Sequence, residues 1–187
     1  MTDGDRLHTG FRDLLRDLGE DPDRPDLQRT PERVMESLRF LTRGYREDLA
    51  AEMSDGLFEE ESRDLVVVRR IEFVSLCEHH MLPFLGVAHV GYLPTDRVVG
   101  ISKLARVVQG FSQRLQIQEK LTAQIAQAVQ DILKPKGVGV VIQSEHSCMT
   151  MRGVNTPGSL LTTSTLLGAV RDDPRTRQEF LGLVRGR

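Results

Sequence analysis

The segment LVVVRRIEFVS, residues 65–75, decides the fold, because its run of β-branched side chains is typical of a strand. The segment LGVAHVGYLP, residues 85–94, predicts a second strand that ends at the turn signal PTD. Residues 137–149, GVGVVIQSEHSCM, predict a third strand, and the Thr- and Ser-rich residues 160–170 predict a fourth. From about residue 64 onward, the chain therefore carries its strands in two pairs.

Two helical patterns lie between the two pairs of strands. Both place apolar residues on one stripe, with Leu104, Val107, Val108, Phe111 and Leu115 in the first and Leu121, Ile125, Val129 and Ile132 in the second. The order strand, strand, helix, helix, strand, strand predicts an α+β fold in which an antiparallel sheet carries two helices on one face. A small open sheet leaves its edges exposed, and pairing these edges between copies of the chain predicts an oligomer.

Residues 1–62 are predicted to form an N-terminal helical region ahead of the sheet domain, residues 63–187. Apolar residues at helical spacing predict an amphipathic helix over residues 5–19. A second helix is predicted to start with Thr30 as its N-cap and to run to about Tyr45. The acidic segment EMSDGLFEEES is interpreted as a short helix and a loop with a solvated face.

Composition narrows the classes of function. The formal net charge of −2 argues against a general nucleic-acid binder, which is usually basic. No run approaches the roughly 18 apolar residues that span a bilayer, and the polar start MTDGDRLHTG resembles no secretory signal, so we expect a cytoplasmic protein without a membrane partner. In that reducing compartment a disulfide between Cys77 and Cys148 is disfavoured, which leaves a metal-binding or catalytic role to weigh.

The motif CEHH, residues 77–80, follows directly on the first predicted strand. A cysteine and a histidine three residues apart on a tight turn can reach one ion, and thiolate with imidazole suits zinc. Cys148 lies in the third predicted strand, where His146 would share its face. Cys77, His80 and Cys148 would leave a fourth position open, which is the catalytic pattern for zinc. The spacing also fits two cysteines that act only as small buried apolar residues.

The remaining histidines are candidates for other roles. His79 cannot easily share an ion with His80, because adjacent side chains point apart, so His79 and His146 are candidates for proton transfer near the metal. A hydrogen-bonded structural histidine is the alternative for both. His89 alternates within a strand and is interpreted as structural or as a local proton relay, and His8 as solvated.

The segment GISKLAR, residues 100–106, joins a strand to a helix and suits an anion. Ser102 can act as the N-cap, and the free N–H groups of the first turn can bind a phosphate. Lys103 and Arg106 lie three residues apart and can face the same region, and Arg152 could bring another cation near the metal. Ordinary capping with solvated cations is the alternative. The chain has no GxxxxGKS or GxGxxG motif, so the common nucleotide-binding folds are unsupported.

Gln118 and Glu119 begin the second predicted helix. A carboxylate at this place can accept two hydrogen bonds from the adjacent N–H groups of a guanine edge. A first-turn acid that complements the helix dipole also explains Glu119, and the residues alone favour this second interpretation.

Three segments together resemble the GTP cyclohydrolase I family. They are SLCEHHMLPFLGVAHVGYLP (75–94), VVGISKLARVVQGFSQRLQIQEKLTAQIA (98–126) and EHSCMTMRGVNTPGS (145–159), and they occur in the order expected for that family. The resemblance extends from about residue 28 to the C-terminus. It combines the metal, anion and base-recognition segments described above.

The resemblance implies a role for each candidate residue. The chemistry would be zinc-dependent hydrolysis of GTP at C8 of guanine, which gives formate and 7,8-dihydroneopterin triphosphate in the first step of pterin and folate biosynthesis. The implied zinc ligands are Cys77, His80 and Cys148, the catalytic residues His79 and His146, the guanine-binding residues Glu119 and Gln118, and the triphosphate-binding residues Ser102, Lys103, Arg106, Arg152 and, from a neighbouring subunit, Arg33.

The family resemblance also implies the tunnelling fold, in which sheets of neighbouring subunits join into a barrel, and a homodecamer with active sites between subunits. One alternative is a tunnelling-fold enzyme of deazapurine or pterin metabolism, such as the nitrile reductase, which needs a cysteine nucleophile and NADPH. Both cysteines here match metal ligands, which argues against that chemistry. The other alternative is an inactive zinc-stabilised scaffold, and the presence of His79, His146 and Glu119 argues against it.

Overall fold

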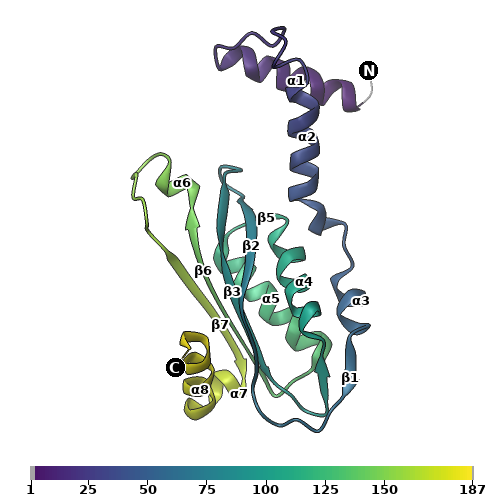
Figure 1. Cartoon of the computed structure of the whole chain (residues 1–187), viewed down its shortest axis with the longest axis vertical. Helices are drawn as coiled ribbons and strands as arrows, with labels where there is room; N and C mark the ends of the chain where they lie inside the picture. The colour runs from purple at the N-terminus through teal and green to yellow at the C-terminus, as the bar shows by residue number, and fades with distance from the viewer. Residues whose placement is uncertain (1–2, 187) are drawn as a thin grey trace. The chain divides into compact units, whose positions relative to one another are not determined.

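The computed structural model describes residues 3–186 of the chain. The chain divides into two compact units, Met1–Thr42 and Arg43–Arg187, and each is described by itself (Figure 1). The functional boundary between residues 62 and 63 stays a prediction.

The first unit contains two helices, α1 (Asp3–Asp17) and α2 (Thr30–Leu41). The amphipathic helix predicted near the N-terminus is present. The N-cap of α2 is Arg29 and not Thr30, and no side chain caps this end, because the helix has already begun at Thr30. α2 also ends at Leu41, before the predicted end at Tyr45. His8, interpreted from sequence as solvated, contacts Glu32 with 3.0 Å between Nε2 and Oε1.

The second unit is built on a five-stranded sheet in the order β5-β2-β3-β6-β7. Its four long strands are antiparallel neighbours, whereas the two-residue strand β5 runs parallel to the end of β2. The strands are β2 (Val66–Cys77), β3 (Pro83–Leu93), β5 (Leu115–Gln116), β6 (Gly137–His146) and β7 (Leu161–Gly168). The four predicted strands are present.

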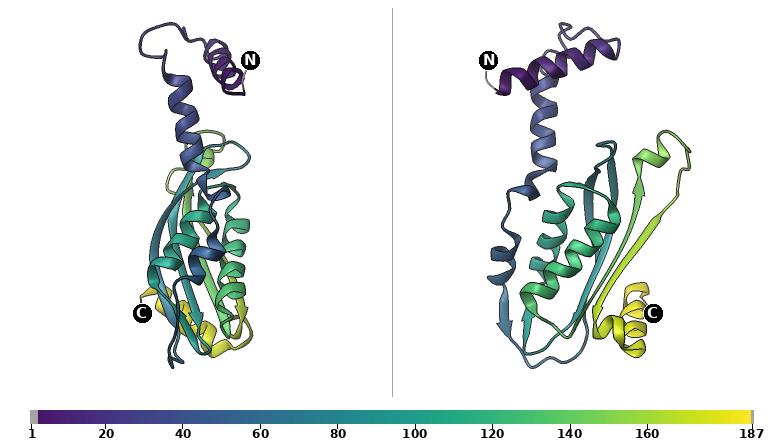
Figure 2. Two further views of the ribbon diagram at one scale, coloured as in Figure 1. Left: turned by 90° about the vertical axis from the view of Figure 1, so that its right-hand side faces the viewer. Right: turned by 180° about the vertical axis from the view of Figure 1, so that it is seen from behind.

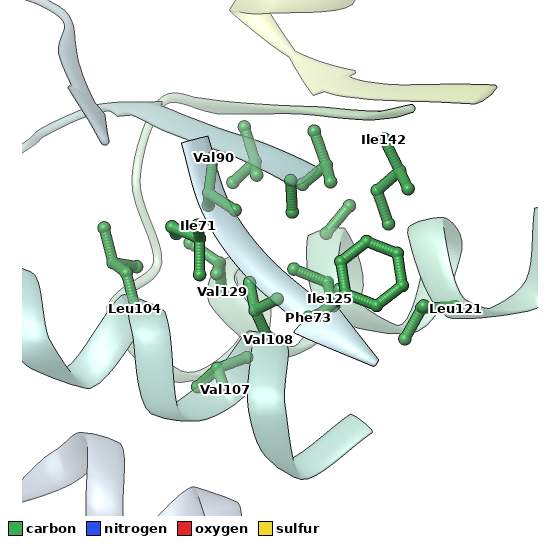
Figure 3. Close-up of a cluster of buried hydrophobic side chains, with 14 of the residues drawn as sticks. Ile71, Phe73, Val90, Leu104, Val107, Val108, Leu121, Ile125, Val129 and Ile142 are labelled. Atoms are coloured by element: carbon green, nitrogen blue, oxygen red, sulfur yellow. The ribbon is translucent and has the colours of Figure 1, made fainter. Parts of the chain in front are cut away.

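Two helices, α4 (Ile101–Ser112) and α5 (Gln118–Leu133), cover one face of this sheet (Figure 2). The interface is the main core of the unit (Figure 3), and its buried side chains include Ile71, Phe73, Val90, Leu104, Val107, Val108, Leu121, Ile125, Val129 and Ile142. Each such side chain contributes about 1.5–3 kcal/mol on full burial. The α+β prediction of an antiparallel sheet with two helices on one face is confirmed, and this core fixes the first turn of α5 against the sheet.

The third predicted strand is shorter than expected. β6 ends at His146, and the next residues form a short helix, α6 (Ser147–Thr150), so the predicted extension to residue 149 is wrong. The pairing of β3 with β6 reaches only Phe84 opposite His146, and β3 begins one residue earlier, at Pro83. Residues after His146 therefore have no neighbouring strand on that side to continue the ladder.

The opposite face of the sheet is covered at one end by α7 (Ala169–Asp172) and α8 (Pro174–Arg185). Asp173 caps α8 by accepting hydrogen bonds from the backbone N–H groups of the first turn. Phe180 of α8 is fully buried, and a Cβ added at Gly139 would lie 2.6 Å from its ring. Glycine on β6 therefore makes room for the ring of Phe180. Farther along the same face, Val74 and Leu85 are exposed.

The strand predicted just before residue 100 is present, but the two-stranded ribbon to which it belongs was not predicted from sequence. β1 (Leu57–Glu59) pairs antiparallel with β4 (Arg97–Val99), and a short helix, α3 (Leu49–Ser54), precedes it. Three residues within an acidic segment give too little alternation to indicate a strand. Among the described residues, no helix is both long and apolar enough to cross a membrane.

Tyr92 holds this ribbon to the main sheet, and its removal gives a first stability prediction. Its buried hydroxyl oxygen accepts a hydrogen bond from the backbone N–H of Val99 at 3.1 Å, and burial raises the pKa of the phenol. Tyr92→Phe is expected to lower the free energy of unfolding by about 1–3 kcal/mol, because the donor loses its partner away from water. Denaturant unfolding measures this change.

Tyr45→Phe is the matched control for Tyr92→Phe. Tyr45 also accepts a backbone hydrogen bond, from Leu115 at 3.0 Å, but its side chain is 57% exposed. Water can replace that partner, so the control should lose less than about 1 kcal/mol. Equal losses in the two variants would contradict the role of burial at Tyr92.

Candidate active site

The CEHH motif forms the turn that connects β2 to β3. Backbone hydrogen bonds close the turn on Cys77, whose carbonyl accepts from the N–H groups of His80 at 3.3 Å and Met81 at 2.8 Å. This curl brings the side chains of Cys77 and His80 to the same side, with 3.8 Å between Sγ and Nδ1. The predicted pairing of these two residues on one turn is therefore present.

Cys148 completes the cluster from α6, at the end of β6. The ligand atoms of Cys77, His80 and Cys148 all lie within 4.8 Å of one another. The prediction that Cys148 lies on a strand face shared with His146 is wrong, because Cys148 lies in a helical turn. The structure nevertheless brings together all three residues that were predicted as metal ligands.

The donor set of this cluster fits zinc. Two sulfurs bound at about 2.3 Å in tetrahedral geometry are roughly 3.8 Å apart, so small side-chain rotations would close the cluster around one ion. Burial raises the pKa of Cys148, and the nearby Cys77 raises it further. A borderline-soft divalent ion accepts two thiolates and an imidazole as ligands. Three protein ligands leave a fourth position for a reacting group.

His146 is the last residue of β6, two residues before Cys148. Its ring stacks on Phe84, with centroids 4.4 Å apart and planes at 5°. Its Nε2 lies 3.0 Å from Oε1 of Gln118. Burial lowers the pKa of His146, and the carboxylate of Glu119 acts in the opposite direction, which places Glu119 within electrostatic range.

The amide of Gln118 fixes which ring nitrogen of His146 carries a proton. The Gln118 side chain is completely buried, and its Nε2 donates to the carbonyl oxygens of Ile142 and Leu161, both at 3.1 Å. Because carbonyl oxygens only accept, the amide cannot be flipped, and its Oε1 must face His146. His146 therefore donates from Nε2, which leaves Nδ1 of the neutral ring as the free basic nitrogen.

The burial of Gln118 bears on its predicted role. The hydroxyl of Ser144 also donates to its Oε1, and its Nε2 also donates to Thr163 at 3.0 Å. In this chain the amide thus contacts strands β6 and β7 and His146, and its predicted contact with a substrate stays a prediction. Glu119, one residue later, is exposed in the first turn of α5.

Two contacts hold the CEHH turn against the start of α5. The backbone N–H of Glu78 donates to the carbonyl of Gln116 at 3.0 Å. The side chain of Glu78 forms an ion pair with Lys120, at 3.1 Å between Oε2 and Nζ. The metal cluster and the predicted guanine-binding carboxylate, Glu119, therefore lie on neighbouring segments.

The comparisons with known proteins agree with this arrangement. The family model for GTP cyclohydrolase I matches residues 7–185. The chain belongs to the GTP cyclohydrolase I family. A protein named GTP cyclohydrolase 1 from Alkalilimnicola ehrlichii is 51% identical over 97% of this chain and 98% of its own length. Proteins of the same name from Synechococcus sp. and Homo sapiens are 54% and 48% identical, over 92% and 96% of this chain and 75% and 72% of their lengths.

The family assignment confirms the prediction that this chain is an enzyme, a GTP cyclohydrolase. His79, a predicted catalytic residue, lies on the CEHH turn next to the ligand His80. The side chain of His79 is exposed, and its ring centroid is 6.2 Å from that of His80 at an angle of 87°. Its predicted catalytic role stays a prediction.

The predicted triphosphate-binding residues of this GTP cyclohydrolase lie mostly on α4. Ser102 does not cap that helix, because the N-cap is Gly100, and Ser102 is exposed in the first turn. Lys103 is half-buried against Gly56, and Arg106 is exposed, 3.9 Å from Glu52.

Arg152 and Arg33, the other two predicted phosphate ligands, differ in placement. Arg152 is exposed just after α6, and its charge lowers the pKa of Cys148, so it lies in electrostatic range of the metal cluster. Arg33 is exposed on α2, in the other unit. Their predicted roles in binding phosphate stay predictions.

The start of α4 and the metal cluster lie near opposite ends of the sheet. Val99, just before α4, donates to Tyr92, which pairs with Val66 at the first residue of β2. Cys77 is the last of the 12 residues of β2, and at about 3.3 Å per residue that strand spans roughly 36 Å. One chain therefore does not place the first turn of α4 beside its own CEHH turn.

Sequence reasoning missed the residues that hold His146. Phe84 stacks on its ring, and Ser144 and Thr163 bond the Gln118 amide. Thr163 could have been noticed from sequence, because it lies on the core-facing side of a predicted strand, where a polar residue needs a hydrogen-bond partner. Its partner could not be named without the pairing of β6 with β7.

Proposed function

We propose that this chain is a zinc-dependent GTP cyclohydrolase I that hydrolyses GTP at C8 of guanine to formate and 7,8-dihydroneopterin triphosphate. This reaction is the first step of pterin and folate biosynthesis. The observation that carries the proposal is the cluster of Cys77, His80 and Cys148 beside His146, in a chain of this family. We further propose a cytoplasmic enzyme with no nucleic-acid or membrane partner.

The residues of the site have distinct proposed tasks. Zinc held by Cys77, His80 and Cys148 would supply a Lewis acid next to guanine C8. His146 would move a proton at the purine ring nitrogen through its free Nδ1, since Gln118 occupies Nε2. Glu119 would accept two hydrogen bonds from the guanine edge, which discriminates against adenine because an adenine would leave the carboxylate unpaired.

His79 is proposed to assist the later steps at the ribose. It is exposed on the same turn as His80, so it can reach a part of the substrate beyond the purine. An imidazole can both donate and accept a proton during ring opening.

The triphosphate is proposed to bind residues from more than one copy of the chain. The first turns of α4 lie near the end of the sheet opposite Cys77, and they carry Ser102, Lys103 and Arg106. A second copy of the chain would therefore supply these residues to a given metal cluster. Arg152 is near the cluster in the same chain, and Arg33 is proposed to come from a neighbour. Two strand edges of the sheet are available to pair with another copy: the outer edge of β7, and the part of β2 that precedes its pairing with β5.

This arrangement is the basis for proposing the family assembly. Edge-to-edge pairing of β7 with β2 of the next copy would join the sheets into the barrel of the tunnelling fold, and two such rings would make a homodecamer with active sites between subunits. Sedimentation or light scattering measures the stoichiometry directly.

The test incubates zinc-loaded protein with GTP and assays formate together with the fluorescence of the iodine-oxidised product. Both products should form, both should be lost on chelation, and both should return when zinc is added back. Formate without a fluorescent pterin would show an enzyme that opens the ring and stops. No formate from a zinc-replete oligomer would overturn the proposal in favour of a scaffold or another substrate.

A further inference from the structure

The face of the sheet away from α4 and α5 contains a cavity that the proposed reaction does not use. Its volume is about 510 Å³, and β2, β3, β6, β7 and α8 contribute its walls. His89 lies between the core residues Ala88 and Val90 on β3, so alternation turns its side chain to this opposite face. Figure 2 shows α8, which contributes to this wall, at one end of the sheet. We refer to it as the arginine cavity.

Positive charge converges on the arginine cavity. Arg69 and Arg70 of β2 and Arg185 of α8 line it, and none of the described residues in its wall is a carboxylate. Arg69 is anchored, because its Nη1 donates to the carbonyl of Leu183 at 3.1 Å. Within residues 3–186, neither Arg70 nor Arg185 forms an ion pair. The guanidinium groups thus lack a counter-charge from the described chain.

The rest of the wall is uncharged: it contains four apolar residues, Val87, Val141, Leu181 and Val184, and several neutral polar groups. His89 is only 6% exposed, and its Nδ1 has no hydrogen-bond partner in the described chain. Burial lowers the pKa of His89, and the charges of Arg69 and Arg70 lower it further. Gln143 and Ser164 add an amide and a hydroxyl to the same wall. Uncompensated buried polar atoms are rare in proteins, and a bound group is one way to satisfy them.

We propose that the arginine cavity binds a small anion that carries at least two phosphate groups, at a site separate from the proposed active site. Guanidinium forks bind phosphate oxygens in pairs, and several of them around one cavity favour a multiply charged ligand. The volume lies within the range of about 300–1,000 Å³ that is usual for small-molecule sites. Gln118 and α5 lie on the other side of the sheet, so the two sites do not overlap.

The test is calorimetric titration of the zinc-loaded full chain with inorganic tripolyphosphate at low salt. The double variant Arg70→Gln/Arg185→Gln is expected to lose tripolyphosphate binding at the arginine cavity, or to bind it there at least ten-fold more weakly. The double variant Lys103→Gln/Arg106→Gln should lose tripolyphosphate binding at the proposed active site and keep binding at the arginine cavity. Formate release from GTP by the Arg70→Gln/Arg185→Gln variant should stay within about two-fold of wild type.

A matched control separates a defined site from general attraction of anions. Arg63→Gln/Arg175→Gln removes the same charge from exposed arginines outside the cavity and should bind tripolyphosphate as wild type does. Equal binding by the cavity variant and wild type would overturn the proposal, and so would an equal loss in the control. Either result leaves the GTP assay unaffected, so a failure of this proposal and a failure of the proposed reaction are distinguishable.

Discussion

Cys148→Ser is expected to abolish zinc binding and to lower formate release from GTP by about 10³-fold or more. A serine hydroxyl stays protonated near neutral pH and is a far weaker zinc ligand than a thiolate. A metal acting as a Lewis acid is worth several kcal/mol of transition-state stabilisation, and each 1.4 kcal/mol is about ten-fold in rate. The cluster holds only two thiols and one imidazole within 4.8 Å, so the loss of one leaves too few ligands.

Metal content per chain after gel filtration and the rate of formate release are the two measurements. Ser147→Ala is the matched control, because Ser147 precedes Cys148 in α6 and lies outside the ligand cluster. This control should keep both zinc and activity. A Cys148→Ser protein that carried one zinc per chain and released formate at the wild-type rate would show that the cluster is not the catalytic metal site.

Much of the sheet domain could be predicted from sequence because its signals are local. The segment 65–75 contains five β-branched residues, and the stripes of α4 and α5 repeat at helical spacing, so each element indicates its own class. The errors fall where a neighbouring element decides. β6 stops at His146 because β3 offers no further partner, and no pattern within residues 137–149 contains that information.

The starts of α2 and α4 were also mispredicted from local sequence. Thr30 and Ser102 are good N-cap types, yet the helices begin at or before them, so Arg29 and Gly100 occupy the cap positions. Neither helix has a side-chain cap hydrogen bond at this end. Propensity is a weak preference that the packing of the apolar stripe overrides.

In the candidate site, too, local features could be predicted from sequence and features set by distant strands could not. The spacing of the CEHH turn indicates a shared ligand position, because three residues of one turn suffice to set it. The environment of Gln118 could not be predicted, since its partners come from β6 and β7, more than 20 residues away. A polar residue at a helix start looks exposed in the sequence, and only the packed strands show that Gln118 is buried and contacts His146.

Gln118→Met is expected to lower kcat for formate release by about 10²-fold and to leave KM for GTP within about three-fold of wild type. Methionine keeps the volume of the side chain but accepts no strong hydrogen bond, so His146 loses the partner that fixes its Nε2 as the donor. A general acid–base residue contributes about 10²–10⁴-fold, and a misplaced proton forfeits part of this. If Gln118 instead contacted guanine directly, KM would rise and kcat would change little.

The substitution also disturbs a buried network, so a second variant is needed. Thr163→Val removes one acceptor of the Gln118 amide but leaves the contact with His146 intact. Gln118→Met should lose about 1–3 kcal/mol of unfolding free energy, because it removes the acceptor of Ser144 and His146. Thr163→Val should lose less, because the two N–H groups of the amide keep the carbonyls of Ile142 and Leu161. Only Gln118→Met should lose kcat. Equal loss of kcat in both variants would assign Gln118 a purely structural role, whereas a rise in KM confined to Gln118→Met would restore its role as a substrate ligand.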